Sequence, residues 1–260
     1  MSTPTSQSAQ PLAVYERSTT QGSKTPVPSN RPIIITIDGP AGTGKSTVAR
    51  MLAAQLGLDF LDTGAMYRAA AAIMIDKEYD EDQIGELVSE VIGADLHFDW
   101  SQDPPTILAW DTPIDHRIRS QEVTDRVSFV ATLSELRRHM VRKQRIIFAQ
   151  HPRLVTEGRD QGSVVFPDAA VKFYLDADPE IRAQRRIDQL GLDPETMSLE
   201  TMCERIIARD RIDSSREDGP LVCPDDAIRV DTSGLNIDAV VDLMVKHTHA
   251  RVADLPELDS

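Results

Sequence analysis

The residues of this chain whose types and spacing most clearly predict chemistry are eight consecutive ones, Gly39 to Ser46, with the sequence Gly-Pro-Ala-Gly-Thr-Gly-Lys-Ser. Two glycines with four residues between them, followed by Lys and Ser, form the phosphate-binding loop pattern. Gly42 and Gly44 can take a positive φ, which lets several backbone N–H groups surround phosphate oxygens. We expect Lys45 to bridge the β- and γ-phosphates of a nucleoside triphosphate, and the Ser46 hydroxyl to bind Mg²⁺.

The flanking sequence places this loop between a strand and a helix. Ile33–Ile37 is a β-branched run typical of a buried strand, and apolar residues at helical spacing follow the loop. Free N–H groups at the start of that helix would face the same anion. A glycine-rich turn with a surface Lys is the alternative, and the agreement of strand, loop and helix argues against it. The residues expected to hold ATP are Gly39, Pro40, Ala41, Gly42, Thr43, Gly44, Lys45, Ser46 and Thr47.

The composition is that of a globular protein with an acidic balance. Of the 260 residues, 40% are hydrophobic and 27% are charged, and the net charge is −14. An acidic chain offers no overall basic surface for DNA or RNA, so we expect no nucleic-acid partner. Two cysteines give no disulfide framework and favour a reducing cytosol. We find no signal-sequence pattern, and the longest apolar run, Ala69–Ile75, is too short to span a bilayer, so we expect a cytoplasmic protein without a membrane partner.

Strand and helix patterns alternate along most of the chain. Residues 1–30 are rich in Ser, Thr, Pro and Gln, which predicts a disordered tail, with recruitment of a partner as the less favoured alternative. The strands expected after the loop lie at 59–61, 94–100, 106–110, 154–157, 171–175 and 226–231. The helices expected lie at 62–75, 80–93, 120–150 with a break near 132–134, 179–190, 199–216 and 235–249. The pair 94–100 and 106–110 predicts a hairpin that is inserted into the βαβ pattern.

Arginines gather in the segment from 182 to 216, which contains no Lys. The residues concerned are Arg182, Arg185 and Arg186 on one side of the first expected helix, and Arg205, Arg209, Asp213 and Arg216 near one side of the second. Surface ion pairs at i, i+4 spacing would explain some of them. The exclusive use of Arg favours bidentate binding of phosphate, above all by Arg209 and Arg216.

Five blocks of sequence carry a resemblance to a known family. In chain order they are Ile-Asp-Gly-Pro-Ala-Gly-Thr-Gly-Lys-Ser-Thr at 37–47, Leu-Asp-Thr-Gly-Ala-Met-Tyr-Arg at 61–68, Glu-Gly-Arg-Asp at 157–160, Val-Val-Phe-Pro-Asp-Ala at 164–169, and Arg-Asp with Asp-Ser-Ser-Arg at 209–216. With them the chain resembles the bacterial cytidylate kinases, which belong to the nucleoside monophosphate kinase group of P-loop proteins. A phosphate loop alone would indicate only nucleotide binding, whereas five blocks in this order are specific to the family.

The resemblance implies an activity and a fold. The activity is the ATP-dependent phosphorylation of CMP and dCMP to their diphosphates with Mg²⁺, in pyrimidine nucleotide metabolism. The fold is the α/β fold of P-loop NTPases, with three layers around a five-stranded parallel sheet, an inserted NMP-binding part with a small antiparallel β element, and a helical LID. The implied kinase domain spans 31–260, with a CORE at 31–78, 152–180 and 221–250, the NMP-binding part at 79–151 and the LID at 181–220. We expect a monomer with CMP and dCMP as its small-molecule partners.

The resemblance also implies roles for single residues. Thr63, Ser128, Arg137 and Asp160 match positions that contact cytosine, Arg68 and Arg159 match arginines on the acceptor phosphate, Arg209 matches a LID arginine at the transferring phosphoryl group, and Asp213 and Arg216 match residues near ribose and phosphate. The implied catalytic set is Lys45, Arg159, Arg209 and Arg216. The chain departs from the family at Ile212, where Arg is common; Arg211 lies one position earlier, a rotation of about 100° on a helix, so we do not expect it to substitute.

Residue chemistry supports a preference for cytosine. Cytosine offers an N4 amine donor, which a carboxylate such as Asp160 can accept, and an N3 acceptor, which Arg137 can bind. Uracil presents an acceptor at O4, which would face that carboxylate unpaired. Two alternatives remain open: a kinase for another monophosphate or a non-nucleotide small molecule, and a regulatory P-loop module without turnover.

Overall fold

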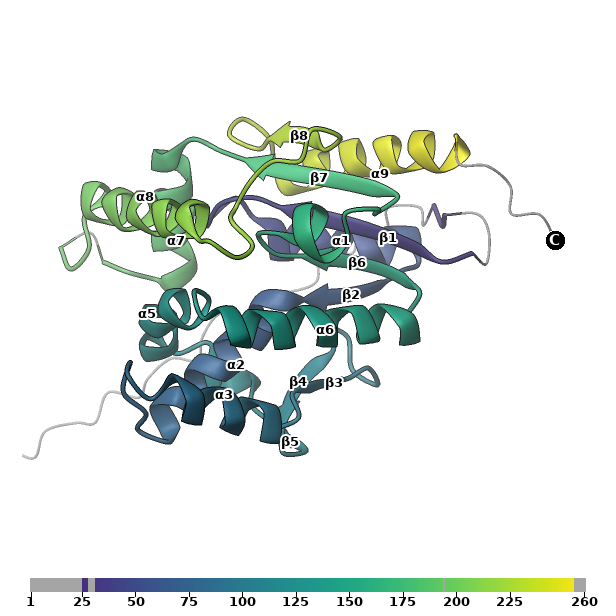
Figure 1. Cartoon of the computed structure of the whole chain (residues 1–260). Helices are drawn as coiled ribbons and strands as arrows, with labels where there is room; N and C mark the ends of the chain where they lie inside the picture. Colours follow the sequence, from purple (N-terminus) through teal and green to yellow (C-terminus); the bar gives the residue numbers. More distant parts are fainter. Residues whose placement is uncertain (1–24, 28–30, 194, 255–260) are drawn as a thin grey trace, which may run out of the picture.

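A five-stranded parallel sheet forms the centre of the molecule in the computed structural model, which describes residues 25–27, 31–193 and 195–254 (Figure 1). The strand order is β2-β6-β1-β7-β8, and every pairing in this sheet is parallel. The strands are β1 (Ile33–Asp38), β2 (Asp59–Asp62), β6 (Arg153–Glu157), β7 (Val171–Asp176) and β8 (Ile228–Asp231). The expected fold class is thereby confirmed.

Helices cover both faces of the sheet because β1 sends apolar side chains to both sides. Ile33, Ile35 and Ile37 belong to the core shared with α1 (Lys45–Leu56) and α9 (Ile237–Ala253). Ile34 belongs to the core on the opposite face, shared with α2 (Thr63–Asp76) and α6 (Ser134–Gln150). All six residues of β1 are buried, which explains its continuous β-branched run.

The segment between α2 and α6 carries a second, three-stranded sheet. It contains α3 (Ile84–Gly93), β3 (His97–Asp99), β4 (Thr106–Ala109), β5 (Thr112–Pro113), α4 (Asp115–Ile118) and α5 (Gln121–Val130). The predicted antiparallel hairpin is the pair β3 and β4; the short strand β5 was not predicted. Helix α3 begins four residues later than expected, because the Gln83 side chain accepts the backbone N–H of Asp80 and holds a turn there.

The helices α7 (Pro179–Leu190) and α8 (Leu199–Ser215) form a pair with a small core of their own. Gly191, with φ +60°, ends α7, and the Ser198 side chain caps α8 by accepting from Thr201 N. Between β6 and β7 lies η1 (Gln161–Val165), a single π-helical turn that the sequence pattern did not predict. Its first amides are bonded by Asp38, whose carboxylate accepts from the N–H groups of Gln161 and Gly162.

The predicted tail falls mostly on residues 1–24 and 28–30, which lie outside the described residues. Within 25–27 the chain packs on α1: Thr25 N donates to Gln55 O, Val27 N donates to Leu56 O, and the Val27 side chain is buried in the core. No helix among the described residues combines the length and the apolar character needed to cross a membrane.

Candidate active site

The phosphate loop joins β1 to α1 at the carboxyl end of the sheet, and its glycines are required by geometry. At Gly39, where φ is +147°, a Cβ atom would lie 2.0 Å from Leu175 O. Gly44 has φ +89° and directly precedes α1, with no side chain capping the helix. Backbone N–H groups at this helix start are therefore free to bind an anion.

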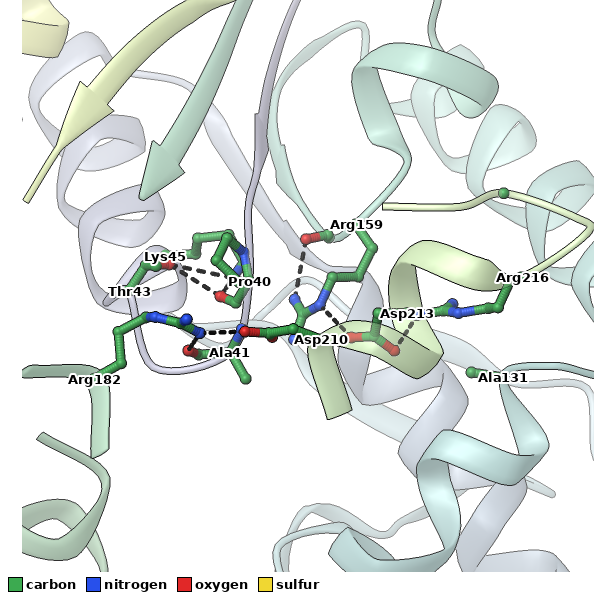
Figure 2. Close-up of polar contacts among 12 residues, drawn as sticks. Pro40, Ala41, Thr43, Lys45, Ala131, Arg159, Arg182, Asp210, Asp213 and Arg216 are labelled. Carbon is green, nitrogen blue, oxygen red and sulfur yellow. Dashed lines mark hydrogen bonds and ion pairs between the residues drawn. The ribbon is translucent and has the colours of Figure 1, made fainter. Parts of the chain in front are cut away.

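Lys45 lies beneath this loop and is 5% exposed. Its Nζ donates to Pro40 O at 2.6 Å and approaches Thr43 Oγ1 at 3.4 Å (Figure 2). Burial, with a smaller effect of the charge on Arg159, lowers the pKa of Lys45 to about 7, although Glu157 and Asp38 oppose the shift. Phosphate oxygens at the loop would supply the negative charge that favours the ammonium form.

The expected magnesium ligand, Ser46, has carboxylates beside it that sequence reasoning did not assign to the metal. Ser46 Oγ donates to Glu157 Oε1 at 2.8 Å. Burial and then the charge of Glu157 raise the pKa of Asp62 to about 7. Both acids stand at the carboxyl ends of neighbouring strands, β2 and β6, paired at this position. Asp62 follows Leu61, and Glu157 begins the Glu-Gly-Arg-Asp block, so both lay within blocks that were already recognised.

These groups fit Mg²⁺, which favours hard oxygen ligands and commonly binds through one or two carboxylates plus substrate phosphates. Among the described residues, no cluster of three or more His, Cys, Asp or Glu side chains could hold a metal. A magnesium ion here would therefore need oxygens of the nucleotide as well as Ser46, Glu157 and Asp62.

One arginine contacts the loop, and two more bond Asp213 of α8. Arg182 of α7 donates from Nη1 to Ala41 O at 3.0 Å and to Asp210 Oδ2 at 2.5 Å, and Asp210 Oδ1 accepts from Ala41 N at 3.2 Å (Figure 2). Arg159 Nε donates to Asp213 Oδ2 at 2.9 Å, and Arg216 Nη2 bonds the other oxygen of the same carboxylate. Burial alone would raise the pKa of Asp213, but the charges of Arg159 and Arg216 outweigh it and lower that pKa.

Two of the predicted site arginines form no ion pair with any described residue. Arg68 donates from Nη1 to Thr124 Oγ1 at 3.0 Å and to Ile118 O at 3.2 Å. Arg209 has a buried Nε without a hydrogen-bond partner. Burial, followed by the nearby charge of Arg159, lowers the pKa of Arg209 to about 10. A guanidinium in this setting is stabilised when an anion binds to it.

Two of the predicted base-contacting residues form a buried ion pair. Arg137 and Asp160 are each 3% exposed and bond directly through Nη2 and Oδ2. The Arg137 guanidinium also lies 5.4 Å from the ring centroid of Tyr67, a residue that sequence reasoning did not select. Burial outweighs the charges of Arg137 and Arg216 and raises the pKa of Asp160. Tyr67 sits between Met66 and Arg68 in a recognised block, which is the one sequence signal that could have identified it.

The remaining predicted site residues are Thr63, Ser128 and Thr47. Thr63 Oγ1 donates to Glu157 O at 2.7 Å, so its hydroxyl hydrogen is already used, while its oxygen can still accept. Ser128 is half-buried on α5, and Thr47 is exposed on α1. Their contacts with a ligand stay predictions.

Comparison with known proteins agrees with the family resemblance of the five sequence blocks. The family model described as Cytidylate kinase matches residues 35–250. A cytidylate kinase of Shewanella loihica is 37% identical over 228 residues, which cover 87% of this chain and 99% of that protein. Cytidylate kinases of Methylococcus capsulatus and Streptococcus thermophilus are 41% identical over 208 residues and 40% identical over 213 residues. These two alignments cover 80% and 82% of this chain, and 93% and 94% of the respective relatives.

Proposed function

The chain belongs to the cytidylate kinase family, and on that premise we propose that it transfers the γ-phosphoryl group of ATP to CMP and dCMP. The products are ADP and CDP or dCDP. One observation supports this reaction above the others: Arg182 of α7 contacts the phosphate loop at Ala41, and the charge of Arg159, which follows β6, acts on both Lys45 of the loop and Arg209 of α8, so cations from separate parts of the chain meet at the carboxyl end of the sheet. This arrangement suits two phosphate-bearing molecules that lie end to end.

On the donor side, the loop amides and Lys45 hold the β- and γ-phosphates. When bound, Mg²⁺ would neutralise charge on these phosphates, and Ser46, Glu157 and Asp62 are the residues that would hold it. Lys45 Nζ already lies inside the loop against Pro40 O, so a small movement brings it to a phosphate oxygen. The donor half needs no proton transfer, because Lys45 acts as a positive charge.

On the acceptor side, an oxygen of the CMP phosphate attacks the γ-phosphorus while the bond to the β–γ bridging oxygen breaks and ADP leaves. The acceptor oxygen is already anionic at neutral pH, so no strong general base is needed. Arg68 and Arg159 orient the acceptor phosphate, and Arg209 stabilises the charge on the phosphoryl group in transit. Asp213 holds Arg159 and Arg216 in place, because each of its two oxygens accepts from one of them.

Selection of the base rests on Arg137 and Asp160. The buried carboxylate accepts from N4 of cytosine, and the guanidinium donates to N3 or O2, with Ser128 and Thr63 as further acceptors. Removal of both groups from water makes a mismatch costly, because uracil would leave a buried acceptor facing another acceptor. We also propose that the enzyme works as a cytoplasmic monomer.

The test is an ADP-release assay on the purified full-length chain with ATP, Mg²⁺ and CMP, dCMP, UMP, AMP or GMP as the acceptor. We expect turnover with CMP and dCMP at least about tenfold more efficient than with the other three, given the buried polar recognition. Preference for another acceptor would overturn the assigned substrate. Binding of ATP without ADP release for any acceptor would favour a regulatory nucleotide-binding module instead.

A further inference from the structure

A buried glutamine follows directly after Asp160 and has no role in the reaction described above. Gln161 is the first residue of η1, and 0% of its surface is exposed. Its backbone N–H donates to Asp38 Oδ1 at 2.9 Å, which ties it to the residue directly ahead of the phosphate loop. Burial of a side-chain amide costs free energy unless the amide forms hydrogen bonds, so the partners of Gln161 show what holds it there.

The Gln161 side chain joins the central sheet to α6. Its Oε1 accepts from Thr156 Oγ1 of β6 at 3.0 Å, and its Nε2 donates to Gln144 Oε1 of α6 at 3.2 Å. Thr156 and Gln144 are also 0% exposed, so bulk water does not compete for these bonds. Gln144 Nε2 has no hydrogen-bond partner among the described residues, so the contact with Gln161 satisfies only one end of that amide.

The same two segments of the chain are therefore bridged twice. Asp160 bonds Arg137 of α6. The next residue, Gln161, bonds Gln144, which lies seven positions after Arg137 on the same helix. Seven residues are close to two helical turns, so Arg137 and Gln144 lie on one face of α6. The first bridge contains the two groups proposed to select cytosine, and the second fixes where α6 lies against the turn that carries one of them.

Hydrogen bonds fix this arrangement more narrowly than apolar contacts do, because hydrogen bonds depend on direction as well as distance. The turn is also closed tightly on the Gln161 side chain. A Cβ atom at Gly158 would lie 2.8 Å from Gln161 Cγ and 2.8 Å from Thr63 Oγ1. In so closely packed a turn, a shift of Gln161 is transmitted to residues 157–160.

We propose that Gln161 is a positioning residue for base selection, which keeps Asp160 and Arg137 in the geometry that cytosine requires. This proposal rests on the proposed phosphorylation of CMP. Because Gln161 is fully buried, it acts through Asp160 and α6 rather than by contact with a nucleotide. A pair of polar groups held within about 0.5 Å of one geometry discriminates between bases, whereas a loosened pair can adapt to uracil.

The first test compares Gln161→Met with Gln150→Met in the full-length enzyme. Methionine has nearly the length of glutamine but cannot form its amide hydrogen bonds, and Gln150 is an exposed residue of α6. In Gln161→Met we expect KM for CMP to rise about fivefold and the ratio of kcat/KM for CMP over UMP to fall about fivefold. Saturated kcat and KM for ATP should stay within about twofold, because the phosphate loop keeps its own geometry. The control should match the parent.

A thermal melt of the same samples separates positioning from stability. A Gln161→Met enzyme that melts earlier but keeps the parent ratio of CMP to UMP would have lost only a structural residue, which would overturn the proposal. The parent's own preference for CMP, measured first, tests the proposed function. A parent that prefers CMP beside a variant that keeps this preference overturns the role of Gln161 alone, and a parent without the preference overturns both.

A second test asks whether the effect passes through Gln144. Gln144→Met should lower the CMP-to-UMP ratio as well, since it breaks the same bridge from α6; it also keeps the proposal testable should Gln161→Met fold poorly. The double variant with both changes should lose no more selectivity than Gln161→Met alone, because it leaves neither amide of the pair unpaired. Losses that multiply in the double variant would mean that the two glutamines act independently, and would overturn the proposed bridge.

Discussion

The phosphate loop and the arginine cluster suit the same kind of anion but present different groups to it. The loop presents backbone N–H groups from one continuous stretch, Gly39 to Ser46, in which only Pro40 lacks an N–H and whose shape depends on positive φ angles at three glycines. The cluster, which comprises Arg68, Arg159, Arg209 and Arg216, uses side chains from three separate parts of the chain. A backbone site is formed as soon as its strand and helix form. A side-chain site depends on the packing of every element that contributes to it.

The two regions also differ in how they manage charge. The loop holds one buried ammonium group, Lys45, against carbonyl and hydroxyl oxygens. In the cluster, Asp213 neutralises Arg159 and Arg216, while Arg68 and Arg209 stay unpaired among the described residues. We infer that the loop already has its binding conformation without a ligand. The cluster, by contrast, is stabilised when an anionic ligand neutralises its unpaired charges.

The largest effect should come from the one side-chain cation of the loop. We expect Lys45→Ala to lower kcat/KM for ATP by about 10³-fold, or about 4 kcal/mol, because no backbone amide can replace a buried positive charge at the β- and γ-phosphates. Initial rates with ATP varied at saturating CMP measure this effect. Lys246→Ala, which removes an exposed cation on α9, should match the parent. A loss below tenfold in Lys45→Ala would mean that the backbone alone binds the donor.

A stability measurement tests the backbone side of the comparison. We expect Gly39→Ala to reduce the free energy of unfolding by about 3 kcal/mol, because the new Cβ would overlap Leu175 O. Gly44→Ala is the matched control: it also has a positive φ, but nothing lies within 4 Å of its Cβ position. The control should lose only about 1 kcal/mol. Equal urea-denaturation midpoints for the two variants would contradict a steric requirement at Gly39.

In the cluster, we expect Arg209→Ala to lower kcat by at least about 10²-fold, or about 2.7 kcal/mol, with little change in stability. The reason is that its guanidinium bonds no described residue, so its removal breaks no ion pair and leaves the transferring phosphoryl group less neutralised. Steady-state kinetics and a thermal melt on the same sample separate the two effects. Near-parent turnover would exclude Arg209 from the reaction.

The smallest effect concerns choice of base. Asp160→Asn should narrow the preference for CMP over UMP by about tenfold, or about 1.4 kcal/mol, because an amide can donate to O4 of uracil where the carboxylate cannot. The ratio of kcat/KM values for the two nucleotides measures this. Asp242→Asn, an exposed acid on α9, serves as the control and should leave the ratio unchanged. An Asp160→Asn enzyme as selective as the parent would remove Asp160 from base recognition.

The same contrast explains what sequence could predict. The loop, its strand and its helix could be predicted because all of their determinants are local. The break near Thr132 was also predicted, and α5 ends at Val130 while α6 begins at Ser134. By contrast, the contact of Ser46 with Glu157 joins residues 111 positions apart, and only the pairing of β2 with β6 places Asp62 beside them.

Elements stabilised by tertiary contacts were also missed. The π-helical turn Gln161–Val165 is held by the Asp38 carboxylate, more than 120 positions earlier, which no local pattern signals. The family resemblance predicted Arg137 and Asp160 as base contacts, and this stays a prediction, whereas the contact of the Tyr67 ring with Arg137 becomes visible only in three dimensions.

Val27 anchors the chain at the end of α1 that lies away from the phosphate loop. Its N–H bonds Leu56 O, the last residue of a helix whose first residue is Lys45. With a rise of about 1.5 Å per residue, the 12 residues of α1 separate the two ends by about 18 Å. A purification tag or fluorescent reporter fused ahead of Thr25 is thus attached on the side of the enzyme away from the phosphate loop. This attachment point suits surface immobilisation, because it leaves the loop open to nucleotide.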